Sequence, residues 1–232
     1  MTINLPILIF DLDGTLIDTA PDLVATLNCI LKINGRNLLE IGQVRKMVGD
    51  GARVLLERGF AEAGEPTKNF DQLVADFIEL YRQQCTALSK PYNGVVEGLK
   101  SLANSGFRMA VCTNKPQDLS EKILTEFELR NYFEVIVGGD RFSVRKPHGY
   151  HLLGALNLMN ASDNTAIMIG DSYNDVASAR NAKLPVILVS YGYTNIPVAD
   201  LKGDLIVKRF KEIPAAVRQI INCNKFRIKP AK

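Results

Sequence analysis

The chain has 232 residues, about one and a half times the roughly 150 residues of a common domain, which indicates one large domain or a core with an insertion. Its 28 basic and 25 acidic residues leave a formal charge of +3, too balanced for a protein that binds nucleic acid through charge alone. Its longest apolar runs fall far short of the ~20 residues that a bilayer-spanning helix needs, so we expect no membrane span.

The compartment is predicted from the N-terminus and the cysteines. Residues 1–4 contain no basic segment, and no small-residue cleavage site follows an apolar stretch. We therefore expect no secretory signal and a cytoplasmic protein. The four cysteines form no C-x-x-C pair and are expected to be reduced residues of the core.

Short apolar runs recur along the chain and alternate with segments of helical period. Each run is apolar throughout, which is typical of strands that are buried on both faces of a parallel sheet. Between the runs, apolar residues recur at helical spacing, as at Leu119, Ile123 and Phe127. This alternation predicts an α/β fold. The predicted strands cover residues 7–10, 109–112, 135–137, 167–169, 186–189 and 205–207.

One connection is far longer than the others. About ninety residues separate the first two predicted strands, whereas a crossover needs only about a dozen. Leu23, Leu27 and Ile30 share one helical face, residues 70–81 carry another, and Gly49-Asp50-Gly51 is predicted to open a third helix. We therefore predict a helical cap domain at residues 18–87 on a core domain formed by residues 1–17 and 88–232.

Two carboxylates follow the first predicted strand. Asp11 and Asp13 lie two residues apart and would point to the same side if the strand geometry continued. They would then face the carboxyl end of the sheet, where open α/β sheets bind ligands. One carboxylate can act as a nucleophile and the other can exchange a proton, with a bound cation keeping the nucleophile ionised. The structural alternative is an aspartate that caps the turn before Gly14.

Polar residues also follow two later strands and stand in one loop. Thr113 and Asn114 can donate to phosphoryl oxygens or cap the next helix. Lys146, kept out of a helix by the proline after it, offers a fixed positive charge or is simply solvated. Asp171 and Asp175 can converge on a cation such as Mg²⁺, or serve as an N-cap and a first-turn acid. If there were no site here, each of these structural alternatives would have to be true independently, at three different strand ends. The combination therefore favours a functional site.

Taken in order, these motifs resemble those of the haloacid dehalogenase superfamily. That pattern is D-x-D-x-T after the first strand, T/S-N after the second, a loop lysine, and G-D-x-x-x-D after a later strand. The helical insertion right after the first motif resembles the cap of that superfamily. The resemblance covers nearly the whole chain and implies a doubly wound, Rossmann-like parallel sheet with an inserted helical cap.

A narrower resemblance, to bacterial phosphoglycolate phosphatases, is closer than that to phosphonatases or β-phosphoglucomutases. It rests on residues 10–21, 48–53, 113–116, 137–140, 146–148 and 190–193. One departure is Gly149-Tyr150, where relatives usually have a second proline. We expect this change to loosen the loop that carries Lys146.

The resemblance implies a Mg²⁺-dependent phosphatase for a small phosphomonoester, with 2-phosphoglycolate as the best match. Asp11 would form an aspartyl-phosphate, and Asp13 would protonate the leaving alcohol and later activate water. The phosphoryl oxygens would be bound by Thr113, Asn114 and Lys146.

The resemblance also implies a metal site and a selective cap. Mg²⁺ would be held by the Asp11 side chain, the Asp13 backbone carbonyl and Asp171, with Asp175 in support. In the cap, the segment from Gly49 to Arg53, including Gly51, would choose the substrate when the cap closes. Arg53 would pair with a substrate carboxylate.

Other functions are compatible with the same core. A phosphosugar mutase uses the same pair of acids, and pyrophosphate, a nucleotide or a sugar phosphate are other phosphatase substrates. A non-catalytic phosphoryl-binding protein is disfavoured, because it would not need both Asp11 and Asp13. We expect a small-molecule phosphoester as partner, with no nucleic acid or membrane, and a monomer or homodimer. His148 and His151 are interpreted as surface or loop residues rather than a zinc pair.

Overall fold

A parallel sheet forms the centre of the protein. The computed structural model describes residues 5–66, 69–161 and 166–223, so residues 1–4, on which the signal prediction depends, lie outside it. The predicted strands are confirmed, with β6 longer by one residue at each end. They are β1 (Ile7–Phe10), β4 (Met109–Cys112), β5 (Val135–Val137), β6 (Ala166–Gly170), β7 (Val186–Val189) and β8 (Leu205–Val207).

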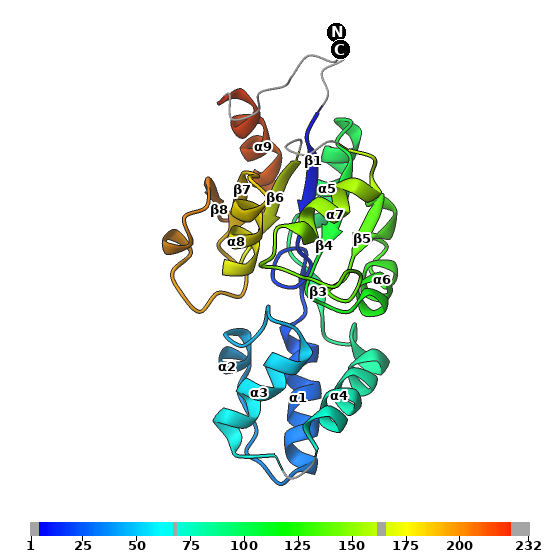
Figure 1. The fold of residues 1–232 in the computed structure, drawn as a ribbon, viewed down its shortest axis with the longest axis vertical. Helices are drawn as coiled ribbons and strands as arrows, with labels where there is room; N and C mark the ends of the chain where they lie inside the picture. The colour runs from blue at the N-terminus through cyan, green and yellow to red at the C-terminus, as the bar shows by residue number, and fades with distance from the viewer. Residues whose placement is uncertain (1–4, 67–68, 162–165, 224–232) are drawn as a thin grey trace.

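The strand order places β1 inside the sheet. The six strands lie in the order β5-β4-β1-β6-β7-β8, and neighbouring strands are parallel (Figure 1). The chain runs outward from β1 through β4 to β5, then returns to β6 on the other side of β1. Open α/β sheets bind ligands where the order reverses in this way, beyond the carboxyl ends of the strands. The residues just after β1 and β6 are therefore at the expected binding position.

Helices cover both faces of this sheet, because successive strand residues point to opposite sides. Leu8 and Phe10 of β1 belong to one buried layer, and Ile7 and Ile9 to the other. The first layer is completed by α5 (Val95–Asn104), α6 (Gln117–Glu126) and α9 (Ile213–Asn222). The second is completed by α7 (Tyr150–Leu158) and α8 (Tyr173–Asn181). The core is thus the doubly wound α/β fold that the resemblance implies.

The described part of the long insertion is helical. It contains α1 (Ala20–Ile33), α2 (Ile41–Arg45), α3 (Ala52–Ala63) and α4 (Phe70–Gln84). In Figure 1 these helices lie together as a separate group next to the carboxyl ends of the strands, which is the position of a cap. The short helix α2 was not predicted, because five residues are too few to show a helical period. It begins with a capping box between Glu40 and Gln43.

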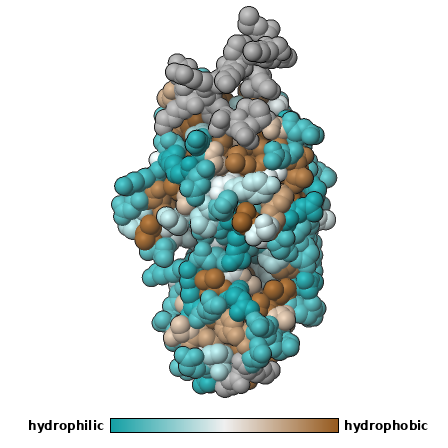
Figure 2. All heavy atoms as spheres, viewed as in Figure 1, coloured by the Kyte–Doolittle hydropathy of each residue, from teal (hydrophilic) through white to brown (hydrophobic). Residues whose placement is uncertain are grey.

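The surface mixes polar and apolar residues. Figure 2 shows hydrophilic residues over much of one face, with smaller hydrophobic areas between them. Among the residues that the structure describes, no helix is long and apolar enough to cross a membrane.

Two short strands connect the cap to the core. β2 (Ile17–Asp18) pairs in antiparallel fashion with β3 (Lys90–Pro91), so the outgoing and returning segments lie side by side. We propose that this pair marks the boundary between the core, residues 1–17 and 88–232, and the cap, residues 18–87. Asp22 of α1 reinforces the connection by accepting hydrogen bonds from the amides of Leu88 and Ser89, at 2.9 and 2.8 Å.

Asp22 is 1% exposed and also accepts a hydrogen bond from the Ser89 hydroxyl, at 2.5 Å. We predict that Asp22→Ala lowers the free energy of unfolding by about 3 kcal/mol, because it leaves buried donors without an acceptor. Denaturant unfolding measures the change. Asp200→Ala, at an exposed aspartate, is the control and should change stability by less than about 0.5 kcal/mol. Equal effects of the two substitutions would contradict this account of the connection.

Candidate active site

The first motif makes a tight turn directly after β1. The amide of Asp11 extends the ladder to β6 by donating to the Ile169 carbonyl at 2.9 Å, and the Gly14 amide then closes the turn on the Ile17 carbonyl at 2.9 Å. Gly14 has a φ of +83°, and a Cβ at this position would lie 2.4 Å from Oδ2 of Asp171. Glycine is therefore needed both for the turn and for the close approach of the acidic loop after β6.

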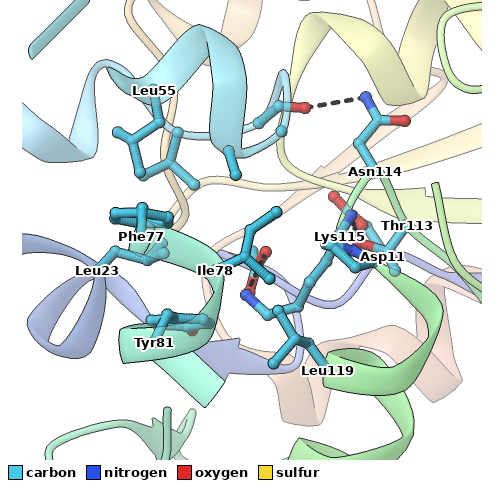
Figure 3. Close-up of a pocket in the computed structure, with 16 residues that line it drawn as sticks. Asp11, Leu23, Leu55, Phe77, Ile78, Tyr81, Thr113, Asn114, Lys115 and Leu119 are labelled. Atoms are coloured by element: carbon cyan, nitrogen blue, oxygen red, sulfur yellow. Dashed lines mark hydrogen bonds and ion pairs between the residues drawn. The ribbon is translucent and has the colours of Figure 1, made fainter. Parts of the chain in front are cut away.

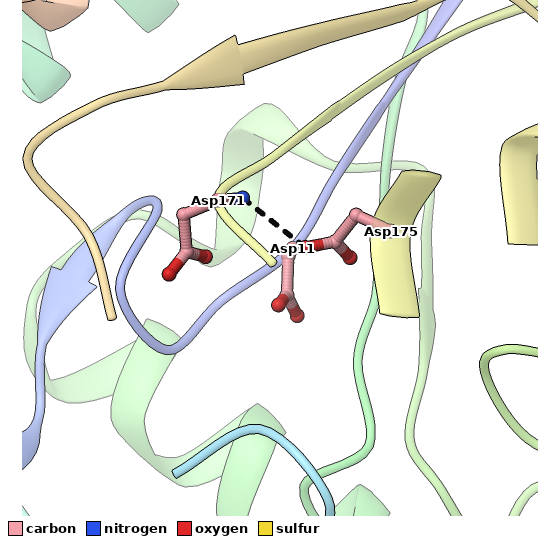
Figure 4. A group of neighbouring side chains, drawn as sticks. All are labelled: Asp11, Asp171 and Asp175. Carbon is pink, nitrogen blue, oxygen red and sulfur yellow. Dashed lines mark hydrogen bonds between the residues drawn. The ribbon is translucent and has the colours of Figure 1, made fainter. Parts of the chain in front are cut away.

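Three buried carboxylates converge beyond the ends of β1 and β6 (Figure 4). Asp11, Asp171 and Asp175 each offer an oxygen within 4.8 Å of the others. Asp171 accepts hydrogen bonds from the Thr15 hydroxyl at 2.8 Å and from the Tyr193 amide at 2.6 Å. These bonds fix the Asp171 carboxylate beside Asp11.

Asp175 organises the loop that follows β6. Its Oδ2 accepts hydrogen bonds from the amides of Asp171 and Ser172, at 3.1 and 3.0 Å, and from the Ser172 hydroxyl at 2.7 Å. Its Oδ1 is 2.7 Å from Nζ of Lys146. Asp175 thus holds both the Asp171 loop and the loop lysine in place.

Lys146 brings the positive charge of the cluster. Its Nζ lies 2.9 Å from Oδ1 of Asp11 and 2.7 Å from Oδ1 of Asp175, and the residue is 2% exposed. Burial alone would lower the pKa of Lys146, but the two carboxylates outweigh burial and raise it. Lys146 therefore stays protonated.

One lysine does not balance three buried acids. Burial raises the pKa of the Asp11 carboxyl to about 6, against the lowering effect of Lys146. Burial, together with the neighbouring Asp175 and Asp11 carboxylates, raises the pKa of Asp171 well above its usual range. A bound cation would relieve this repulsion, and a set of hard carboxylate oxygens suits a divalent ion such as Mg²⁺. The cluster therefore fits a metal ion.

The residues after β4 face the same place. Thr113 is 2% exposed and lines the pocket beside Asp11. Asn114 donates from Nδ2 to the carbonyls of Gly49 and Lys146, both at 3.0 Å. The amide group of Asn114 thus connects the cap to the loop that carries Lys146, a role that the sequence analysis did not predict.

The cap loop before α3 closes over the core. The Gly49 carbonyl accepts hydrogen bonds from Asn114 and from Asn174, the second at 3.2 Å. Asn174 also donates to Oδ1 of Asp50 at 2.7 Å, and Asp50 pairs with Arg58 at 2.6 Å. The loop after β4 and the first turn of α8 therefore hold the tip of the cap loop.

A pocket of about 40 Å³ lies between cap and core (Figure 3). The cap wall is almost entirely apolar and includes Leu55, Phe77, Ile78 and Tyr81, whereas Asp11 and Lys115 belong to the core wall. The predicted residues that line the pocket are Asp11, Asp13, Gly51, Thr113 and Asn114.

Lys115 is a pocket residue that the sequence motifs do not single out. Its side chain is 4% exposed, and its Nζ lies 2.9 and 3.0 Å from the two carboxylate oxygens of Asp13. Nζ is also 4.6 Å from the centre of the Tyr81 ring of α4. The only sequence signal for Lys115 is its position directly after Thr113-Asn114. Its orientation depends on a cap helix that is distant in sequence.

Arg53 does not face the pocket. Its guanidinium pairs with Asp71 and lies 5.5 Å from the centre of the Phe70 ring, and its side chain is 49% exposed. The expected pairing of Arg53 with a substrate carboxylate therefore has no support from its position. Gly51, two residues earlier, does line the pocket.

Comparisons with known proteins agree with the geometry. Residues 8–189 match the family model described as haloacid dehalogenase-like hydrolase. The chain is 46% identical to a phosphoglycolate phosphatase of Caulobacter vibrioides, covering 89% of this chain and 88% of that protein. It is 40% identical to a phosphoglycolate phosphatase of Agrobacterium fabrum, covering 94% of each.

A solved structure shows the same fold. The crystal structure of a predicted phosphoglycolate phosphatase from Haemophilus somnus has a TM-score of 0.88 at 31% identity, covering 93% of this chain and 99% of that one. The chain therefore belongs to the haloacid dehalogenase-like hydrolase family. Within it, the chain is a phosphoric monoester hydrolase, as the motifs predict.

We predict that Lys146→Met destabilises the fold by about 3 to 5 kcal/mol in the absence of divalent ions, because Asp11 and Asp175 lose their shared cation. The pKa of Asp11, already about 6 in the fold, should rise further above its unfolded value. The folded state then binds more protons than the unfolded state, so stability falls as pH rises.

Urea unfolding at pH 5 and pH 8 tests this prediction, and the loss should be larger at pH 8. Lys100→Met, at an exposed lysine of α5, is the control. A loss that is equal at both pH values would show that Lys146 does not balance the buried acids.

Proposed function

We propose that the protein is a Mg²⁺-dependent phosphatase that hydrolyses 2-phosphoglycolate to glycolate and phosphate through an aspartyl-phosphate on Asp11. The observation that carries this proposal is the convergence of Asp11, Asp171 and Lys146 at one buried point, next to a small pocket that also contains Asp13. The phosphoglycolate phosphatases similar to this chain over nearly its whole length support the choice of substrate.

The first half of the reaction uses both acids of the first motif. A carboxylate oxygen of Asp11 attacks the phosphorus, and the bond from phosphorus to the alcohol oxygen breaks. Asp13 gives a proton to that oxygen, so glycolate leaves as a neutral alcohol at this end. Lys146, which touches Asp11, stabilises the negative charge of the phosphoryl oxygens.

The second half returns the enzyme to its starting state. Asp13, now ionised, takes a proton from a water molecule as the water oxygen attacks the phosphorus. The bond from phosphorus to Asp11 then breaks, and phosphate leaves. Thr113 is the proposed donor to a phosphoryl oxygen from the core wall. Asn114 would join it by giving up its hydrogen bond to the Gly49 carbonyl.

We propose that Asp11, Asp171 and the backbone carbonyl of Asp13 hold Mg²⁺, while Asp175 supports the site. The raised pKa values of Asp11 and Asp171 support this choice, because they reflect buried negative charge without enough positive charge nearby. When bound, the ion supplies positive charge against the transferring phosphoryl group.

The pocket favours a small substrate with a second negative charge. The cap wall of the pocket offers few polar groups to the hydroxyl groups of a hexose, so a two-carbon acid suits this site better. Among the described residues that line the pocket, the charged ones are Asp11, Asp13 and Lys115. We therefore propose that Lys115, rather than Arg53, pairs with the carboxylate of phosphoglycolate.

The charge of Lys115 is suited to this task. Burial alone would lower the pKa of Lys115, but the Asp13 carboxylate raises it, so the ammonium group remains charged. Its position over the Tyr81 ring keeps Nζ at the boundary between the core and the cap wall. A substrate carboxylate placed there would replace Asp13 as the partner of Lys115, so that Asp13 can carry the proton that it gives to the leaving oxygen.

A phosphate-release assay tests the proposed reaction. The wild-type protein should release phosphate from 2-phosphoglycolate with Mg²⁺, lose this activity with a chelator and regain it when Mg²⁺ is returned. Asp11→Asn should stop turnover by removing the nucleophile. The thermal unfolding temperature of the same variant shows whether it is folded. Turnover by folded Asp11→Asn near the wild-type rate would rule out the covalent mechanism.

Selectivity is tested by comparing 2-phosphoglycolate with ethyl phosphate, in which a methyl group replaces the carboxylate. Lys115→Met should reduce the ratio of the two kcat/KM values by about tenfold to a hundredfold, the value of a charge-assisted hydrogen bond. Arg53→Met should leave the ratio within about twofold. Because both substrates are measured with the same variant, a general loss of activity affects both kcat/KM values and cancels in their ratio. If only Arg53→Met reduced it, the original assignment of the carboxylate to Arg53 would be right.

A further inference from the structure

The loop between β5 and α7 is held firmly on its outer side. The sequence predicts that Gly149-Tyr150, in place of a second proline, loosens this loop. In the structure, a Cβ at Gly149 would lie 2.7 Å from the Ala182 amide nitrogen, so only glycine lets the loop pack this closely on the end of α8. Asn181 adds a hydrogen bond from Nδ2 to the Pro147 carbonyl, at 3.0 Å. Gly149 and Asn181 thus pack the loop against the end of α8.

His151 holds the inner side of the same loop. The interpretation of His151 as a surface or loop residue is wrong, because it lies in the first turn of α7 and is 0% exposed. Its Nδ1 accepts a hydrogen bond from the Lys146 amide at 3.2 Å, and its Nε2 lies 3.1 Å from the Gly138 carbonyl. Since a carbonyl only accepts, Nε2 carries the hydrogen and Nδ1 keeps its lone pair.

The surroundings of the ring keep it neutral. The charged groups that act on it are Lys146 and Arg145, both in the same loop. Burial, together with these two cations, lowers the pKa of His151 to about 4, against the raising effect of the Gly138 carbonyl. From β4, the Cys112 thiol donates to the His151 carbonyl at 3.6 Å, and burial raises the pKa of this thiol to about 12. The Phe142 ring meets the imidazole edge to face.

We propose that His151 is a positioning residue for Lys146, an inference that rests on the proposed role of Lys146 at the phosphoryl group. The imidazole connects the Lys146 amide to the residue after β5, while Asn114, in the loop after β4, holds the Lys146 carbonyl at 3.0 Å. The peptide group of Lys146 is therefore fixed from two sides. This places its Nζ 2.9 Å from Asp11 rather than at any of the many points that a free lysine side chain could reach.

The position of a charge near the reacting atoms matters for rate more than for binding. A shift of about 1 Å in such a group can cost on the order of a hundredfold in turnover. A neutral acceptor at Nδ1 is needed, because a hydrogen on this atom, the second on the ring, would point at the Lys146 N–H. Loss of the acceptor at Nδ1 of His151 should therefore lower kcat.

Two matched variants separate the contacts of the ring. In His151→Asn the side-chain oxygen can take the place of Nδ1 and accept from the Lys146 amide. In His151→Gln the longer side chain can take the place of Nε2 and donate to Gly138 instead. We expect kcat of the Asn variant to stay within about threefold of the wild type, and kcat of the Gln variant to fall at least tenfold, with KM little changed.

The assay uses an activated aryl phosphate with Mg²⁺, so it does not depend on the choice of phosphoglycolate as substrate. His148→Gln is the control, since His148 is exposed, and it should behave as the wild type. If the wild type released no phosphate from any phosphoester, the proposed function would fail. If the wild type were active and the Asn and Gln variants, both folded, had the same kcat, the positioning role would be overturned.

A measurement on the unchanged protein covers the case in which a variant does not fold. The chain has only two histidines, so ¹⁵N NMR of the imidazole rings can assign both. His151 should be neutral with its hydrogen on Nε2 at pH 7 and remain neutral at pH 5.5. A ring that is charged at pH 7, or that carries its hydrogen on Nδ1, would exclude the hydrogen bond from the Lys146 amide and with it the proposal.

Discussion

The ion pairs that Lys146 makes with Asp11 and Asp175 are the interaction on which the rest of the site depends. Three acids gather where the strand order reverses, and one buried lysine compensates only part of their charge. Residues around the cluster keep these charged side chains close together. The tight turn at Gly14 lets Asp171 approach, and Asp175 fixes the loop after β6. The remaining negative charge is what makes the cluster suitable for a divalent cation.

The cap adds a different physical environment to this charged centre. Its wall is almost entirely apolar, so it lowers the polarity around Asp11 and Lys115 and strengthens the electrostatic interactions there. The closed position is not held by apolar contact alone, because Asn114 and Asn174 both donate to the Gly49 carbonyl. The same residue, Asn114, also holds the Lys146 carbonyl. Closure of the cap and placement of the lysine are thus physically connected.

Much of the fold was predictable because its signals are local. The strands are short apolar runs buried on both faces, and α1 and α4 show a clear helical period, so their residues alone identify them. The five residues of α2 are too few to show a period. The motifs at the strand ends were predictable for the same reason, since parallel strands bring their carboxyl ends to one edge and Asp11, Thr113 and Asp171 each follow a strand directly.

The sequence by itself therefore determined the α/β core, the inserted cap and the acids and lysine that meet at the edge of the sheet. Only the tertiary structure decided which neighbouring side chains complete the site. Arg53 pairs with Asp71 on the surface. Lys115 instead forms an ion pair with Asp13 and lies over the Tyr81 ring. His151 is buried and accepts a hydrogen bond from the Lys146 amide. These outcomes depend on contacts between segments far apart in the chain. Local spacing carries no information on them, because a side chain's direction is set by the partners that packing brings to it.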